Sequence, residues 1–203
     1  MNVYKEYQNI IDCAEELIEQ EALFYPEFFT DSKICEDIFS DCKICNLSGT
    51  FSPQNKGVGS QNPLLFVISD RTKEINKNFK SFDIKSGNLF TKMLTAMGLR
   101  KDDVFITTYF KCKEANIKNS NCRKTLEKQI NLLGPDVILA LGEITSSMIL
   151  ERKDSIEDYR NENLTFMGKP FYASYHPSDL ILNPNLKKKS WYDLQKIMKV
   201  LGK

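Results

Sequence analysis

The apolar residues along the chain follow two patterns, one typical of helices and one typical of buried strands. In residues 2–24, apolar side chains such as Val3, Ile10 and Leu17 recur at helical spacing with acidic residues between them. This spacing predicts an amphipathic helix. Residues 25–62 have no such period and contain several prolines and glycines, so we expect this stretch to be loop.

After residue 62, short apolar runs alternate with helical segments. Continuous apolar runs predict four strands, at Leu64–Ile68, Val104–Tyr109, Asp136–Leu141 and Pro170–Tyr175. Helical spacing predicts four helices, at Gly87–Met97, Cys122–Leu133, Thr145–Leu150 and Asn185–Leu201. Apolar strands separated by helices indicate an α/β fold, in which helices cover both faces of a parallel sheet.

A ligand site is expected at the carboxyl ends of these strands, as in other sheets of this class. The segments that follow the four strands are residues 69–71, 108–112, 142–143 and 176–178. The last segment begins with His176, the only histidine in the protein. A lone histidine is often structural, but a position between a strand end and Pro177 favours a functional role.

The composition is that of a soluble globular protein. With 203 residues, 41% of them hydrophobic and 27% charged, the chain is long enough for one domain with a substantial core. The net charge of +1 gives no overall attraction to nucleic acid or membrane. No apolar stretch reaches the roughly 20 residues that span a bilayer, and the N-terminus lacks a signal-peptide pattern. We therefore expect a cytoplasmic location.

The six cysteines point to metal binding or catalysis rather than disulfides in a reducing compartment. Cys13 and Cys35 are interpreted as structural or incidental. The four with informative positions are Cys42, Cys45, Cys112 and Cys122. The first two form a C-x-x-C pair, and the last two flank a strand end and a helix start, so all four can converge. Four thiolates suit zinc or an iron–sulfur cluster, and the spacing alone leaves both open, along with unconnected core cysteines.

Several motifs occur in order along the chain. They are Cys-Lys-Ile-Cys-Asn-Leu at 42–47, a strand ending in Lys-Cys at 105–112, Leu-Gly-Pro-Asp-Val-Ile-Leu-Ala-Leu-Gly at 133–142, Tyr-His-Pro-Ser at 175–178, Asn-Pro at 183–184 and Trp-Tyr-Asp-Leu at 191–194. In this ordered set the chain resembles the iron–sulfur uracil-DNA glycosylases, the fourth family of the uracil-DNA glycosylase superfamily.

The resemblance implies a three-layer αβα sandwich with a four-stranded parallel sheet, over residues 41–203. Residues 1–40 fall outside it and are expected to form an N-terminal helical extension. The cofactor that it implies is a 4Fe–4S cluster on Cys42, Cys45, Cys112 and Cys122. It also implies uracil-containing or damaged DNA as the partner, and we expect a monomer that does not associate with membranes.

The chain departs from the family pattern in two motifs. The family has Gly-Glu-x-Pro-Gly after the first strand, with a glutamate linked to activation of the attacking water. Here residues 68–72 read Ile-Ser-Asp-Arg-Thr, so Ser69 takes the glutamate position and Asp70 is the nearest carboxylate. Thr108 stands where the family has the asparagine that reads the uracil edge. Phe82, the base-stacking position, and His176 match the family.

The resemblance implies roles for the matching residues and suggests which residues stand in where the pattern differs. His176 would donate a hydrogen bond to the uracil O2 atom, where negative charge develops as the base departs. Asp70, with Ser69 beside it, is the candidate for water activation. Phe82, Thr108 and Ser178 are expected to contact the base.

Four further residues are expected to contact the DNA duplex. Leu180 and Ile181 are candidates for a wedge pressed into the duplex, with simple loop packing as the alternative. Lys187 and Lys188 are candidates for phosphate contacts, although most basic runs like that of residues 187–189 are simply solvated faces.

Two functional hypotheses follow from these residues. The first is a DNA glycosylase that hydrolyses the N-glycosidic bond of uracil, or of a related damaged base, for base-excision repair. The alternative is a catalytically degenerate iron–sulfur protein of the same fold that binds DNA or lesions. Action on another nucleoside or nucleotide is a third, weaker hypothesis.

Overall fold

The computed structural model describes residues 38–40, 56–69, 84–112 and 122–203. Residues 1–37 of the expected N-terminal extension lie outside these ranges, so the extension and the domain boundary at residue 41 stay predictions. Among the described residues, no helix combines the length and the apolar character that a membrane span requires.

The described elements alternate between strand and helix for most of the chain. In order they are β1 (Val58–Gly59), β2 (Leu65–Ser69), α4 (Ile84–Ala96), the 3-10 helix η3 (Lys101–Asp103), β3 (Val104–Thr108), α5 (Cys122–Leu133), β4 (Val137–Leu141), α6 (Glu143–Leu150), α7 (Ile156–Asn161), β5 (Leu164–Phe166), β6 (Lys169–Ser174), α8 (Pro177–Leu182) and α9 (Leu186–Leu201).

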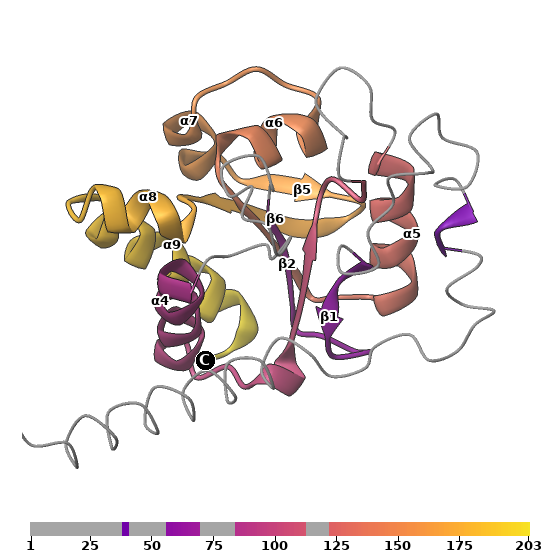
Figure 1. Ribbon diagram of the computed structural model, residues 1–203, viewed down its shortest axis with the longest axis horizontal. Helices are drawn as coiled ribbons and strands as arrows, with labels where there is room; N and C mark the ends of the chain where they lie inside the picture. The colour runs from indigo at the N-terminus through magenta and orange to yellow at the C-terminus, as the bar shows by residue number, and fades with distance from the viewer. Residues whose placement is uncertain (1–37, 41–55, 70–83, 113–121) are drawn as a thin grey trace, which may run out of the picture.

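A six-stranded sheet with the order β1-β3-β2-β4-β6-β5 lies at the centre of these elements (Figure 1). Neighbours among β3, β2, β4 and β6 run parallel, whereas β1 and β5 are antiparallel to β3 and β6. The predicted α/β class is confirmed, and each of the four predicted strands is present with its ends moved by one residue at most. The described sheet nevertheless has six strands where four were expected.

The two additional strands, β1 and β5, lie at the edges of the sheet and are only two and three residues long. Runs this short carry no readable period, so the pattern of apolar residues could not predict them. A glycine allows β1 to pair with β3. A Cβ atom at Gly59 would overlap the main chain of Val104 and Phe105, and its φ of +130° also favours glycine.

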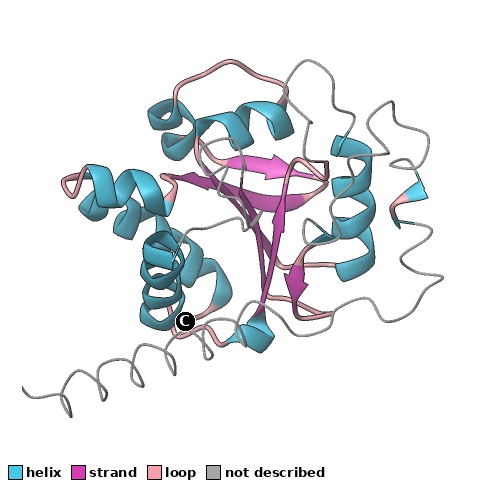
Figure 2. Cartoon of the chain, viewed as in Figure 1, coloured by secondary structure: helices cyan, strands magenta, loops and turns pink. Residues whose placement is uncertain are grey.

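Helices cover both faces of the sheet, which gives three layers (Figure 2). One core cluster joins alternate strand residues, including Leu65 and Val67, to α4, α8 and α9. The other joins the intervening residues, including Phe66 and Ile68, to α5, α6 and α7. Successive side chains of a strand point to opposite faces, so a strand buried on both sides is apolar along most of its length. All five residues of each of β2, β3 and β4 are buried.

The helices include two that the sequence pattern did not predict, α7 and α8, each six residues long. Ser155 and Asp158 form a capping box at the start of α7. His176 caps α8, and Pro177 occupies its first turn, where a missing N–H costs nothing. The chain therefore turns from β6 directly into a helix at the only histidine.

The carboxyl ends of the central strands lie at one level. Ser69 pairs in register with Thr108 of β3 and with Leu141 of β4, and Leu141 pairs with Ser174 of β6. The four segments that were expected to form the site thus leave the sheet at the same edge.

Candidate functional site

His176 and Ser69 meet at this edge of the sheet. The Oγ atom of Ser69 lies 3.1 Å from Nε2 of His176, and both residues are buried. Ser69 is the last residue of β2 and follows Leu65 and Val67 in the alternation, so its side chain points to the face covered by α4, α8 and α9. Ser69, which takes the place of the glutamate in the family that this chain resembles, is therefore in direct contact with the histidine.

The other ring nitrogen of His176 determines its tautomer. The backbone N–H of Ser178 donates to Nδ1 at 3.3 Å, and the Ser178 Oγ lies 2.6 Å from the same atom. A backbone N–H can only donate, so Nδ1 accepts and carries no proton. In the neutral ring the proton is then on Nε2, which donates to Ser69 Oγ. The first turn of α8 thus holds the imidazole with its N–H directed at the strand ends.

Thr108 lies beside this pair. It is the register partner of Ser69 on β3, and alternation along the strand directs its side chain to the same face of the sheet. Its hydroxyl donates to the carbonyl oxygen of Phe110 at 2.8 Å. Because its one proton is used in that bond, the Thr108 hydroxyl can offer only lone pairs to a ligand.

The two described cysteines of the predicted cluster, Cys112 and Cys122, are both buried. They lie just after β3 and at the first residue of α5, and the backbone N–H of Lys111 donates to Cys122 Sγ at 3.4 Å. Burial, reinforced by the negative charge of Cys122, raises the pKa of Tyr109 to about 12. A backbone N–H directed at a shielded sulfur is the setting that iron–sulfur clusters use, so this pair fits such a group.

The predicted ligand set is not complete within the described ranges. Cys42 and Cys45 lie outside them, and no group of three candidate ligands occurs among the residues that the structure describes. Asp70 and Phe82, the candidates for water activation and base stacking, also lie outside the described residues.

The wedge candidates on α8 differ sharply in exposure. Leu180 is 2% exposed and packs in the core under α8, whereas Ile181 is 38% exposed. The most exposed apolar residue of α8 is Leu182, at 83%, which was not among the residues predicted to contact DNA. The short helix explains this result, because its inward face takes Leu180 and its last residue, Leu182, faces solvent. In this conformation Leu180 is not available to a DNA duplex.

The three lysines at the start of α9 also differ from one another, in their contacts. Lys187 and Lys188 are exposed, as expected for residues that contact phosphates. Lys189 instead donates to Glu157 Oε1 at 2.6 Å and belongs to a network of charged residues.

That network lies at the end of β6, two residues before His176, and was not predicted from the sequence. Arg160 of α7 forms a two-point ion pair with Asp193 of α9, with N–O distances of 2.6 and 3.0 Å. Ser174, the last residue of β6, donates to Asp193 Oδ2 at 2.8 Å. Both members of the ion pair are buried. The network anchors the end of the strand that carries the histidine.

Glu157 connects the same network to the residue before the histidine. It accepts a hydrogen bond from the Tyr175 hydroxyl and forms ion pairs with Arg160 and Lys189. The hydrogen bond from Lys189, followed by that from Tyr175, lowers the pKa of Glu157 to about 2. The Trp-Tyr-Asp-Leu motif was a signal for this network, because Asp193 is its acidic residue.

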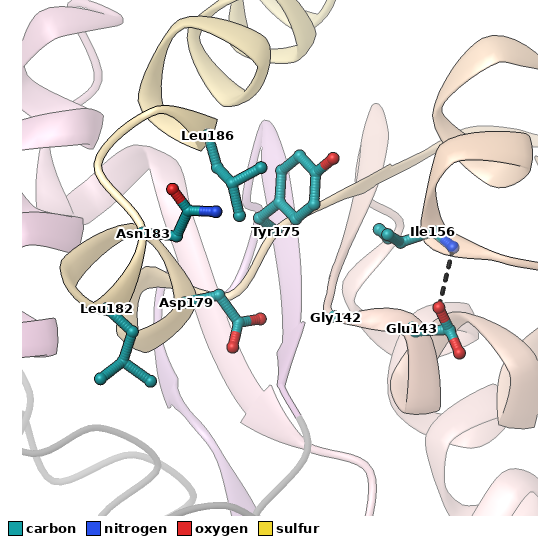
Figure 3. Close-up of a pocket in the computed structure, with 8 residues that line it drawn as sticks. All are labelled: Gly142, Glu143, Ile156, Tyr175, Asp179, Leu182, Asn183 and Leu186. Carbon is teal, nitrogen blue, oxygen red and sulfur yellow. Dashed lines mark hydrogen bonds between the residues drawn. The ribbon is translucent and has the colours of Figure 1, made fainter.

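A pocket of about 330 Å³ opens next to the His176 turn, between α6 and α8 (Figure 3). Its lining residues are Gly142, Glu143, Ile156, Tyr175, Asp179, Leu182, Asn183 and Leu186. Figure 3 shows Asp179 on one side and Glu143 on the other, where Glu143 accepts a hydrogen bond of 3.0 Å from the Ile156 N–H. Two carboxylates disfavour a phosphate group inside this pocket.

Comparison with known proteins identifies the family. The model of the uracil-DNA glycosylase superfamily matches residues 57–195. The chain is 28% identical over 185 residues to the type-4 uracil-DNA glycosylase of Archaeoglobus fulgidus, which covers 84% of this chain and 92% of that protein. It is 30% identical over 162 residues to the type-4 uracil-DNA glycosylase of Thermotoga maritima, covering 74% and 83% of the two chains.

A third relative, the type-4 uracil-DNA glycosylase of Sulfurisphaera tokodaii, is 29% identical over 181 residues, which cover 81% of this chain and 82% of the relative. The match to the family model extends from β1 through the His176 turn into α9. On this basis, the chain belongs to the uracil-DNA glycosylase superfamily and is similar over most of its length to type-4 members.

Proposed function

We propose that this protein is a DNA glycosylase that hydrolyses the N-glycosidic bond of uracil in DNA. The observation that carries the proposal is His176, a buried imidazole whose N–H is directed at the edge of the sheet where the base would bind. The names of the type-4 relatives support the same reaction.

In the proposed reaction the uracil leaves the DNA stack and enters the site at the strand ends. The bond between C1′ and N1 breaks, and its electron pair moves into the base, where negative charge collects on O2. The Nε2–H of His176 donates to that oxygen in place of Ser69 Oγ. The oxygen of a water molecule then bonds to C1′, and the water releases one proton. A donor fixed in advance needs no reorganisation when charge develops, which is how such groups lower barriers.

Ser69 is not the base that receives the proton of the water. Its hydroxyl accepts from Nε2–H, and a hydroxyl has no ability to hold a further proton at neutral pH. We propose that Asp70 takes this role. We expect the reaction to be slower than in relatives that have glutamate at position 69, because Asp70 is one residue further along the chain.

Base recognition is proposed to come from Phe82 as a stacking surface and from Thr108 and Ser178 as polar contacts. The hydroxyl of Thr108 accepts but does not donate, so it can receive the N3–H of uracil but cannot donate to O4. It can equally receive the amino group of a cytosine. We therefore infer weaker discrimination between bases than an asparagine would give.

DNA contacts are proposed for Lys187 and Lys188, together with Ile181 and Leu182, the exposed apolar residues of α8. Lys187 and Lys188 would contact phosphates and position the duplex without reading its sequence. Of the two residues first considered as a wedge, Ile181 remains available at the surface, and Leu182 joins it because of its exposure.

A 4Fe–4S cluster is proposed on Cys42, Cys45, Cys112 and Cys122. The burial of Cys112 and Cys122 and the N–H directed at Cys122 Sγ support it. When bound, this group would cross-link the loop of residues 42–45 to the end of β3 and the start of α5, and it takes no part in bond breaking. The four thiolates would hold it from three separate parts of the chain.

The test is incubation of the purified protein with single- and double-stranded DNA that contains uracil, followed by alkaline cleavage. We expect strand scission from the wild type and a loss of about 10²- to 10³-fold with His176→Ala. Scission by the wild type at the level of His176→Ala would contradict the proposal. Salt-dependent binding to the same DNA without scission would instead support the degenerate, lesion-binding alternative.

A further inference from the structure

Lys111 has an unusual environment for a lysine, because its side chain is completely buried. Its Nζ atom donates to Thr107 Oγ1 at 2.7 Å, to the carbonyl oxygen of Thr108 at 2.6 Å and to Gln129 Oε1 at 2.9 Å. The first two acceptors belong to the end of β3 and the third to α5. One ammonium group therefore joins the end of the strand to the helix that covers it.

The backbone of Lys111 contacts the cysteine pair. Its N–H donates to Cys122 Sγ at 3.4 Å, and the next residue in the chain is Cys112. The side chain and the main chain of this residue thus point to two different places. One is the strand end beside the base site, and the other is the pair of sulfurs.

The turn after β3 is held from both sides through Thr108. The carbonyl oxygen of Thr108 accepts from Lys111 Nζ, and its hydroxyl donates to the carbonyl oxygen of Phe110. A hydrogen bond to a carbonyl fixes the plane of the following peptide. The ammonium of Lys111 therefore sets the direction in which Thr108 faces the site.

A charge in this position is not needed for packing alone. Burying an ammonium group is unfavourable unless hydrogen bonds replace the lost water, and a methionine has similar length without this cost. All three acceptors of Lys111 named above are well placed, within 2.9 Å of Nζ. The network extends to Gln129, whose Nε2 atom donates to the carbonyl oxygen of Lys56, the first residue of its described segment.

We propose that Lys111 is a positioning residue that couples Cys112 and Cys122 to the base-contacting end of β3 at Thr108. The inference rests on the proposed function, in that it explains how the cysteine pair affects a reaction that takes place elsewhere in the molecule. In this arrangement a change at the sulfurs is passed to Thr108 through one residue.

The first experiment compares the full-length Lys111→Met protein with a matched control, Lys124→Met, on the exposed side of α5. For Lys111→Met we expect single-turnover uracil excision to slow by about 10- to 100-fold. KM for the DNA should not change, because the lysines proposed to contact phosphates lie on the opposite face of the sheet. Lys124→Met should match the wild type in both measurements. Excision by Lys111→Met at the wild-type rate would overturn the proposal.

The second experiment does not depend on activity. Hydrogen exchange measured by mass spectrometry should show faster exchange over residues 104–110 in Lys111→Met than in Lys124→Met. The visible absorbance of the iron–sulfur group should also decay about tenfold faster in chelator. If the wild type excises no uracil, the proposed function is wrong, but hydrogen exchange and absorbance decay still test the role of Lys111. Unchanged exchange over residues 104–110 in Lys111→Met would overturn that role.

A milder variant covers the case in which Lys111→Met does not fold. Thr107→Val keeps the shape of the side chain and removes one acceptor of Nζ, so we expect changes in the same direction but only about 2- to 10-fold. A Thr107→Val protein with wild-type excision, exchange and absorbance decay, beside an insoluble Lys111→Met, would show that Lys111 serves stability alone and would overturn the proposal.

Discussion

The Nε2–H group of His176 donates a hydrogen bond of 3.1 Å to the Oγ atom of Ser69, and these residues are 107 positions apart in the chain. The tautomer that makes this possible is set from the other side of the ring, where the Ser178 N–H donates to Nδ1. The histidine is therefore oriented by its own helix and does not depend on Ser69. This separation leads to the first prediction.

Replacing Ser69 should affect the reaction much less than replacing His176. We expect Ser69→Ala to change the single-turnover rate of uracil excision by less than about tenfold, because only one neutral hydrogen bond is lost and the ring stays oriented. His176→Ala should lower the rate by about 10²- to 10³-fold. Equal losses in the two variants would show that the serine hydroxyl takes part in the chemical step.

Thr108→Asn should improve uracil selectivity. The amide supplies both a donor and an acceptor, whereas the Thr108 hydroxyl has its proton bound to Phe110. One added hydrogen bond contributes about 0.5–1.5 kcal/mol, so the ratio of uracil to cytosine excision should rise by about 2- to 10-fold. Thr108→Val, which has the same shape without the hydroxyl, serves as the control and should not raise the ratio. A fall in the ratio for Thr108→Asn would contradict the assignment of Thr108 to the base site.

Breaking the ion pair between Arg160 and Asp193 should strongly destabilise the protein. Asp193→Asn leaves the buried guanidinium with only the partly exposed Glu157 as a charged partner, and removing one member of a buried ion pair typically costs about 3–5 kcal/mol. For a chain of this size the melting temperature should fall by roughly 6–20 °C. Asp136→Asn, which changes an exposed carboxylate, should leave the melting temperature within about 1 °C. Calorimetry of the two variants checks this, and equal melting temperatures would contradict it.

Glu157 should make stability depend on pH in the acidic range. Its pKa is lowered from 4.5 to about 2, so its stabilising contribution is complete above pH 4.5 and disappears as the pH falls towards 2. The side chain is 41% exposed, and solvent screening therefore limits the contribution to about 1 kcal/mol or less. Urea unfolding of the wild type and of Glu157→Gln should differ at pH 6 and converge as the pH falls towards 2. A constant difference over that range would exclude Glu157 as its source.

The cysteines should hold iron. We expect elemental analysis to find iron in the wild type, and we expect Cys112→Ser and Cys122→Ser each to lose that iron and the visible absorbance. Cys13→Ser should keep both, because Cys13 is interpreted as incidental. A colourless protein loaded with zinc after anaerobic purification would replace the cluster by a zinc site.

The sequence by itself determined the parallel core of the sheet and the points at which its central strands end. Strands β2, β3 and β4 are buried at every position, so their residues are apolar apart from the strand-end residues Ser69, Thr107 and Thr108, and these runs were readable to within one residue. His176 could be selected from its place at a strand end. The ordered cysteine, His-Pro-Ser and Trp-Tyr-Asp-Leu motifs led to the family that the comparisons show.

Only the tertiary structure decided which side chains meet. Edge strands β1 and β5 are too short to show a period, and the burial of Leu180 beside the exposed Leu182 depends on how α8 packs on the core. The contact of Ser69 with His176 and the ion pair of Arg160 with Asp193 join residues far apart in the chain. A local pattern records whether a residue is buried, because burial follows from the period of its own element. Its partner is set by the packing of separate elements.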